Sequence, residues 1–141
     1  MSETEIKPLK WEPVPGIGYT VVRRPDGGMH YTFTDVSRPT LLHWREFALN
    51  HLYDSDRLTR NLYDLRQIKS IPKEAIQIAV EANSDPAARN IRLAVPVSSE
   101  AVKAALEEII ALSAPGGAEI GIFMQEDKAE AWLNRPLITM I

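Results

Sequence analysis

Hydrophobic and polar residues repeat with two different periods along this chain, and the change of period separates predicted strands from predicted helices. Near the N-terminus, two runs rich in β-branched and aromatic residues lie at 18–24 and 28–35. The sequence Pro-Asp-Gly-Gly separates them at 25–28. Asp-Gly between two such runs is typical of a tight turn that joins antiparallel strands. The folded part of the chain is therefore predicted to begin with a β-hairpin.

Three later apolar runs predict the other strands, at 60–68, 91–97 and 118–124. The run at 91–97 is apolar almost throughout, as in strands that are covered on both faces of a sheet. A segment with helical periodicity precedes each of these runs, so strand and helix alternate after the hairpin. This order predicts an α/β domain with a five-stranded, mostly parallel sheet, an N-terminal hairpin and four flanking helices.

Four segments place apolar residues three or four positions apart, which is the spacing along one face of a helix. Ser37 is expected to cap the first helix, Pro72 to open the second, and Ser98 or Ser99 to cap the third. The Pro-Gly-Gly sequence at 115–117 is expected to end the third helix. The predicted inward faces are, in chain order, Leu41, Trp44, Ala48 and Leu52; Ala75, Ile76, Ala79 and Val80; Val102, Ala105, Leu106, Ile109 and Leu112; and Ala129, Trp132 and Leu133.

The chain of 141 residues is long enough for one domain with its own core. We assign this domain to 17–134, with a proline-rich, flexible arm at 1–16 and an apolar tail at 135–141. Trp11 is expected to dock the arm on the domain. The tail either covers the domain or packs against a second copy, and the second alternative predicts a homodimer.

Hydrophobic residues make up 45% and charged residues 25% of the chain, as in ordinary globular domains. The sequence has no cysteine, which excludes disulfides and thiolate sites and agrees with a cytoplasmic location. Its first residues do not resemble a signal peptide, and no apolar run is long enough for a membrane span. The net charge of −3, without a basic cluster, argues against nucleic acid as a partner.

Asp64 and Arg66 are the first candidates for a ligand-binding site, because a predicted strand carries an acid and a base two positions apart. Side chains two apart on a strand share a face. The carboxyl ends of parallel strands open into the ligand crevice of such folds, where Asp64 would accept hydrogen bonds and Arg66 would clamp an anion. The alternative, which we favour, is structural: Asp64 bonds the N–H groups of the next loop while Arg66 extends to solvent.

The predicted helix starts near this strand end are further candidates. Free N–H groups at Ser98 and Ser99, and at Lys73, could hold an anion beside Arg66. Capping alone also accounts for serine at such positions, and we favour it. Ser70, just before the second helix, is either a cap or a site of modification, and the cap is again the favoured interpretation.

Catalytic and metal-binding motifs are absent from the sequence. It has no Gly-x-Ser-x-Gly elbow, no phosphate-binding loop and no dinucleotide fingerprint before a helix. His43 and His51 are eight positions apart, not the four that place two metal ligands together on a helix, so we predict no metal and no cofactor. An enzyme that uses Asp64, Arg66 and Ser98 is the least favoured alternative, because acid–base catalysis needs groups within hydrogen-bond reach of one another.

Three motifs, in this order, resemble the SpoIIAA-like family, which consists of STAS/SEC14-type domains. They are YDLRQI at 63–68, IRLAVPVSS at 91–99 and GIFMQEDKAEAWL at 121–133. The resemblance covers about 17–134 and implies a five-stranded sheet with four helices. The wider STAS group includes anti-sigma-factor antagonists, in which a serine of an Asp-Ser-Ser-Gly element at a helix start is phosphorylated.

The matching element of this chain is Pro-Lys-Glu-Ala at 72–75, so neither serine position carries a hydroxyl group. The resemblance therefore implies a STAS-like fold without the phosphorylation switch. The leading functional hypothesis is a non-catalytic binding or regulatory module that acts through a protein partner or a small-molecule ligand. The alternative is a carrier of a small apolar or amphipathic ligand such as a lipid. This alternative rests on the SEC14 side of the family and on the apolar third and fourth helices.

Overall fold

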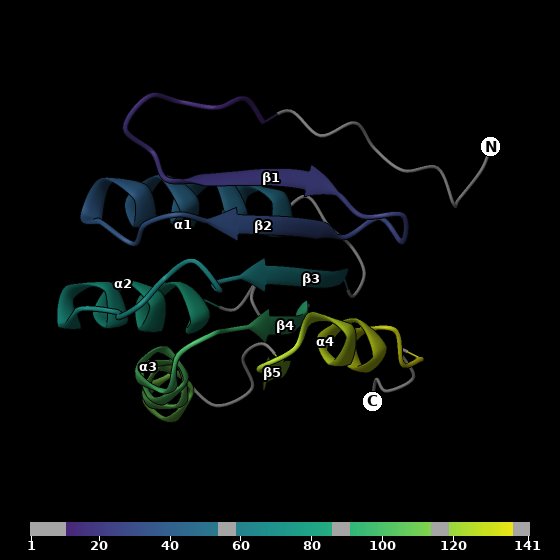
Figure 1. Ribbon diagram of the computed structural model, residues 1–141. Coiled ribbons are helices and arrows are strands. Elements are labelled where there is room, and N and C mark those ends of the chain that lie inside the picture. Colours follow the sequence, from purple (N-terminus) through teal and green to yellow (C-terminus); the bar gives the residue numbers. More distant parts are fainter. Residues whose placement is uncertain (1–10, 54–58, 86–90, 114–118, 137–141) are drawn as a thin grey trace.

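The computed structural model describes residues 11–53, 59–85, 91–113 and 119–136, without the side chains of 51–53. Five strands and four helices follow one another in these ranges (Figure 1). In chain order they are β1 (Tyr19–Arg23), β2 (Met29–Phe33), α1 (Arg38–Tyr53), β3 (Thr59–Asp64), α2 (Lys73–Asn83), β4 (Ile91–Pro96), α3 (Glu100–Leu112), β5 (Glu119–Phe123) and α4 (Glu126–Leu133).

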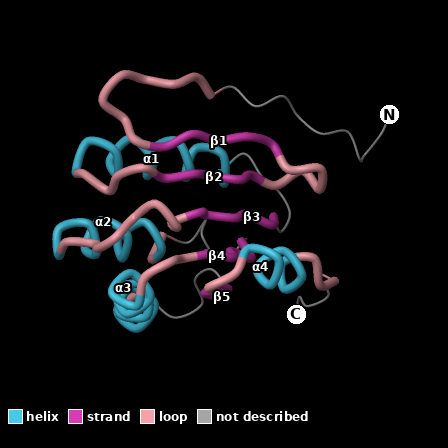
Figure 2. The backbone as a smooth tube through the Cα atoms, viewed as in Figure 1, coloured by secondary structure: helices cyan, strands magenta, loops and turns pink. Residues whose placement is uncertain are grey.

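The strands form one sheet in the order β1-β2-β3-β4-β5, so each strand lies beside its predecessor in the chain (Figure 2). β1 and β2 pair antiparallel, and every later pair is parallel. The predicted fold class, an α/β domain with a five-stranded, mostly parallel sheet, an N-terminal hairpin and four helices, is thereby confirmed.

Three helices cover one face of the sheet, and α4 covers part of the other. Each parallel strand is added on the same side of its predecessor, so right-handed crossovers bring α1, α2 and α3 to one face. There α2 packs between α1 and α3, whereas α4 packs on β3, β4 and β5. Figure 1 shows α4 in front of β4 and β5, with α1 behind β1 and β2.

The hairpin turn follows from the residues that the sequence places there. Asp26 accepts a hydrogen bond through Oδ1 from the Gly28 N–H at 2.9 Å, as turn aspartates commonly do. Gly27 has a φ of 92°, a conformation that costs glycine little and other residues much. A Cβ atom at Gly28 would collide with the carbonyl oxygen of Arg60 on β3. The Pro-Asp-Gly-Gly sequence is thus needed both for the turn and for its fit against the sheet.

The third strand is shorter than the predicted 60–68. β3 ends at Asp64, and Leu65 forms only an isolated bridge to Val97. The Arg66 N–H donates to Asp64 Oδ1 at 3.0 Å, so a local side-chain-to-backbone bond turns the chain out of the sheet. The expectation that Asp64 and Arg66 share one face of a strand is therefore wrong, because Arg66 lies in the turn.

Helix caps agree with the sequence in one case and differ in another. Ser99 caps α3, since its Oγ accepts from the Val102 N–H at 3.0 Å. The N-cap of α2 is Pro72, and no side chain bonds the free N–H groups at that end. The expected cap at Ser70 is therefore wrong; the chain enters α2 at the proline itself, whose fixed φ suits a helix start.

Some predicted inward positions also differ. α2 buries Ile78 and Ala82, which the sequence pattern left out, whereas Ala79 and Val80 are half-buried. Leu112 was expected in the core but is 60% exposed, because it is the last residue of α3 and no described element covers it. The spacing of apolar residues thus identifies the buried face of a helix but not every residue on it.

The ends of the chain are described only in part. Trp11 packs its ring against Tyr19 with 5.6 Å between centroids, so this part of the predicted arm lies on the domain. Residues 1–10 of the arm, 137–141 of the tail and the predicted helix stop at 115–117 lie outside the described residues, as does the side chain of Leu52. None of the described helices is both long enough and apolar enough to cross a lipid bilayer.

Candidate functional site

Asp64 and Arg66 form a closed ion pair at the carboxyl end of β3. Arg66 donates from Nε to Asp64 Oδ1 at 2.9 Å and from Nη2 to Asp64 Oδ2 at 2.7 Å. The same Nη2 reaches Glu126 Oε1 at 3.2 Å, in the first turn of α4. A bidentate pair of this kind uses the guanidinium fork that an anionic ligand would need. The geometry therefore supports the structural interpretation of this pair more than the anion clamp.

The electrostatics of Asp64 agree with this geometry. Burial raises its pKa, but hydrogen bonds from the Arg66 guanidinium and backbone N–H lower it more, so the pKa lies below the ordinary aspartate value. The neighbouring carboxylate of Glu126 and that of Asp64 together keep Arg66 protonated, and its pKa is raised. Asp64, Arg66 and Glu126 thus form a charged cluster that joins the turn after β3 to the start of α4.

The two serines at the start of α3 bind the same turn. Ser98 donates from Oγ to the Arg66 carbonyl oxygen at 2.6 Å, and Ser99 donates to the Lys69 carbonyl oxygen at 3.2 Å. Ser98 therefore lies close to Arg66, as the sequence predicted. Ser70 and Lys73 are exposed. The structure has a recess beside the hairpin and an apolar cavity between the sheet and α1–α3, and none of the predicted site residues lines either of them. These residues are Asp64, Arg66, Ser70, Lys73, Ser98 and Ser99. A ligand-binding role for these residues stays a prediction.

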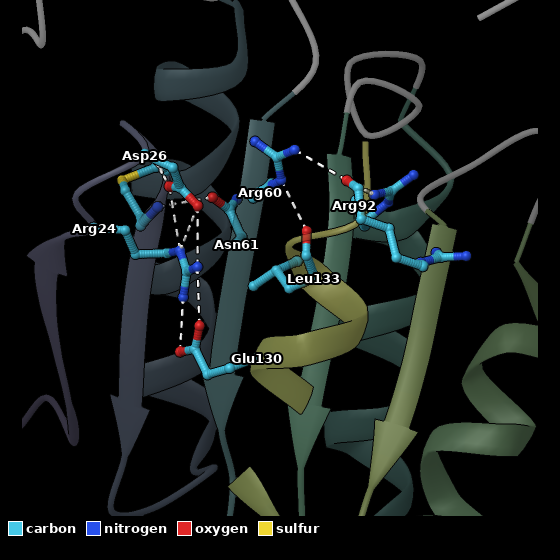
Figure 3. A network of polar contacts seen from close by, with 10 residues as sticks. Arg24, Asp26, Arg60, Asn61, Arg92, Glu130 and Leu133 are labelled. Carbon is cyan, nitrogen blue, oxygen red and sulfur yellow. Dashed lines mark hydrogen bonds and ion pairs between the residues drawn. The ribbon is translucent and has the colours of Figure 1, made fainter. Parts of the chain in front are cut away.

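A second polar network lies around the other end of α4 (Figure 3). Arg24 is 7% exposed and donates from both terminal nitrogens to Glu130, at 2.9 and 3.1 Å, and from Nη2 to Asp26 at 3.0 Å. A recess of about 470 Å³ beside the hairpin is lined by these three side chains. Because all three are paired with one another, the network fastens the hairpin to α4.

Arg60 and Arg92 complete this network at the C-terminus of α4. Arg60 donates to the Leu133 carbonyl oxygen at 2.8 Å, and Arg92 donates to the Arg135 carbonyl oxygen at 2.6 Å (Figure 3). The last carbonyls of a helix have no partner within the helix and carry partial negative charge. Arg60 satisfies the carbonyl of Leu133, the last residue of α4, whereas Arg92, which is 8% exposed, binds the Arg135 carbonyl just past the helix end. Both cations on the sheet therefore have a structural role.

An apolar cavity lies on the opposite face, between the sheet and the layer of α1, α2 and α3. It is a cavity of about 110 Å³ whose wall is almost entirely apolar. α2 contributes Ala75, Ala79 and Ala82, spaced four and three apart, together with Asn83 at its end, so most of its lining face consists of methyl groups. The small side chains leave space above β3 and β4 that larger residues would fill.

This empty space has a measurable energetic cost. Closed cavities made by core substitutions lower stability by about 24 cal/mol per Å³. Because this cavity is partly open to solvent, ~2.6 kcal/mol is the upper limit for filling its 110 Å³. Apolar cavities of about 150 Å³ in other proteins stay dry and bind benzene or xenon. A cavity of this size and lining can therefore hold a compact apolar molecule of roughly six heavy atoms.

Tyr63 and Trp44 place one polar pair in the cavity wall. The Trp44 Nε1–H in α1 donates to the Tyr63 hydroxyl oxygen on β3 at 3.2 Å. The Tyr63 ring also packs edge-on against Tyr31, with 4.7 Å between centroids. Burial raises the pKa of the Tyr63 phenol, so the hydroxyl keeps its proton over the physiological range.

Neither the cavity nor this pair is predicted by the sequence pattern. The available signal was the alanine face of α2, which was interpreted as ordinary core packing. His30 and His43 do not form a metal site: among the described residues, no three histidine, aspartate or glutamate side chains converge to hold a metal ion. His43 instead bonds the Tyr19 hydroxyl through Nδ1 at 2.7 Å.

Comparison of the chain with family models, with curated proteins and with solved structures gives no match. The resemblance to the SpoIIAA-like family therefore stays a prediction.

Proposed function

We propose that this protein is a non-catalytic binding module whose ligand is a small apolar molecule held between the sheet and α1–α3. The observation that carries the proposal is the cavity of about 110 Å³ with its almost wholly apolar wall. A ligand that fills this space makes packing contacts that the empty protein lacks, worth up to ~2.6 kcal/mol. Between the two functions that the sequence suggested, the geometry thus favours the carrier of a small apolar ligand.

The state of the charged groups supports a non-catalytic role. Arg66 donates to both Asp64 and Glu126, and Arg24 donates to Glu130. Acid–base catalysis needs groups that are free to meet a substrate. These pairs are instead used to hold α4 against the sheet.

The STAS-like family assignment belongs to the same proposal. What supports it is the agreement between the expected and observed sheet and helices, and the position of Asp64 at the end of β3. α2 begins at Lys73 after Pro72, and 72–75 carry no hydroxyl group, so we infer that a phosphorylation switch of the antagonist type is lacking. Under this proposal the protein is a ligand-binding relative of such domains in the cytoplasm.

Native mass spectrometry of the purified protein tests the function first. A co-purifying small molecule supports the carrier. A clean apo mass together with a stably bound protein favours the regulatory module that acts through a protein partner. Titration with xenon or benzene, followed by NMR, then locates the site: chemical-shift changes should be concentrated at residues of the cavity wall.

A filled-cavity variant sharpens this test. Ala79→Leu should abolish xenon and benzene binding, because the added side chain occupies the space. Ala104→Leu makes the same change on an exposed face of α3 and should bind both probes normally. Equal binding by Ala79→Leu and wild type would show that the probes do not use this cavity.

The homodimer is a separate proposal. Arg92 donates to the carbonyl oxygens of Arg135 and Pro136, so a chain cut after Pro136 keeps these bonds and removes only 137–141. If the apolar tail joins two copies, light scattering should show a dimer for the full chain and a monomer for the shortened one. An unchanged mass would remove the tail from the dimer proposal.

A further inference from the structure

The hydrogen bond between Trp44 and Tyr63 has only one possible direction. An indole N–H is a donor and never an acceptor, so the Tyr63 oxygen must accept from Trp44. The phenolic hydrogen of Tyr63 is therefore not used in the bond to Trp44 and can be donated to a different acceptor. Among the described residues, no other hydrogen-bond partner of this hydroxyl is found within reach. Tyr63 therefore has an unused donor.

Tyr63 lines the cavity, which is where its unused donor can meet a ligand. The residue is on β3, in the middle of the sheet, and faces the helix layer, yet it is only partly buried. Both Tyr63 and Trp44 line the cavity. A donor without an acceptor in apolar surroundings costs about 1–3 kcal/mol, whereas a ligand atom that accepts from it removes this cost.

We propose that the ligand is a compact apolar molecule with one neutral hydrogen-bond acceptor, such as a carbonyl or ether oxygen, which accepts from the Tyr63 hydroxyl. This inference rests on the proposed function and adds the chemical class of the ligand. The Tyr63 hydroxyl supplies orientation, and the alanine face of α2 with the apolar wall around it supplies the binding energy.

An anionic ligand fits the cavity less well. The cation among the described lining residues is Arg45, which donates to Glu81 at 2.8 Å and has a side chain 33% exposed. It is therefore paired and lies at the rim. A carboxylate placed at Tyr63 would lose its hydration without gaining a counter-ion, which is costly.

Two isosteric probes test the inference, cyclopentanone and methylenecyclopentane, since they differ mainly in the acceptor oxygen. Calorimetric titration of wild type and Tyr63→Phe gives four affinities. Cyclopentanone should bind Tyr63→Phe about 3- to 10-fold more weakly than wild type, which is the usual worth of one buried hydrogen bond. Methylenecyclopentane should bind both proteins equally, because it cannot accept from the hydroxyl.

The outcomes separate this inference from the proposed function. If both probes bind both proteins with unchanged affinity, the cavity site stands and the role of Tyr63 is wrong. If neither probe binds wild type, the ligand-binding function itself fails. Loss of both probes only in Tyr63→Phe, with a native circular dichroism spectrum, would also overturn the inference, because it would show a packing role and no selective donor.

A measurement on the wild-type protein covers the case in which Tyr63→Phe does not fold. The carbonyl stretching band of bound cyclopentanone should lie at lower frequency than that of the ketone in hexane, because a phenolic donor weakens the C=O bond. Ala79→Leu, with the cavity filled, should show only the band of the ketone in water. A bound ketone with the hexane frequency would exclude the hydrogen bond to Tyr63.

Discussion

Arg24 and Glu130 stand 106 positions apart in the chain, yet the two terminal nitrogens of the guanidinium bind the two carboxylate oxygens at 2.9 and 3.1 Å. The pair joins the hairpin to the last helix, and Asp26 holds the guanidinium from its other side (Figure 3). A bidentate pair with one nearly buried partner is the strong form of this interaction.

Glu130→Gln should lower the free energy of unfolding by about 1–2 kcal/mol, since Arg24 then keeps only Asp26 as a charged partner. Urea unfolding measures this loss. The matched control is Glu74→Gln, which removes the exposed partner of Arg38 and should change stability by less than ~0.5 kcal/mol. Equal effects of the two substitutions would contradict the fastening role of Arg24.

Asp64→Asn should cost about 1–2 kcal/mol near neutral pH, because the bidentate bond from Arg66 loses its charge. The pKa of Asp64 is lower in the folded protein than its ordinary value of 3.8. Its stabilisation is therefore complete above ~pH 5 and is lost as the pH falls through 3.8 towards the folded pKa. The stability difference between wild type and Asp64→Asn should shrink over the same interval.

Urea unfolding at a series of pH values between neutrality and pH ~2 checks this dependence. Asp127→Asn, an exposed position in α4, serves as the control for the loss of one carboxylate. A gap between wild type and Asp64→Asn that stays constant down to the lowest pH would show that the charge of Asp64 is not what stabilises the turn.

Ser99→Ala should destabilise the protein by about 1 kcal/mol, because α3 loses its N-cap bond to Val102. Ser98→Ala removes only the exposed hydrogen bond to the Arg66 carbonyl oxygen and should cost less than ~0.5 kcal/mol. Thermal unfolding distinguishes the two. A larger loss in Ser98→Ala would mean that the turn after β3, more than the helix cap, controls stability here.

Ala79→Leu should stabilise the unliganded protein by about 1–2 kcal/mol, a part of the ~2.6 kcal/mol that is the upper limit for filling the cavity. The exposed substitution Ala104→Leu should change stability by less than ~0.5 kcal/mol. Chemical unfolding without ligand measures both. A clear destabilisation by Ala79→Leu would indicate that the space does not admit a leucine side chain.

Much of the candidate site could not be predicted from the sequence. Ser98 and Arg66 were expected at one sheet edge and do meet there, because the carboxyl ends of parallel strands share an edge. The bond from the next loop to Asp64 was expected, but β3 was predicted to run to 68 and ends at Asp64, since a side-chain bond to a backbone N–H competes locally with strand pairing. The cavity was missed because the alanines of α2 are as compatible with close packing as with a void.

The sequence alone determined the kinds of elements, their order and the mixed sheet that they form, since hydrophobic period and turn residues act over a few neighbouring positions. Only the tertiary structure decided how closely α2 approaches the sheet, and that Trp44 would donate to Tyr63 nineteen positions later. A void and a buried donor depend on the relative positions of three or more elements. No local sequence pattern determines how these elements are positioned relative to one another.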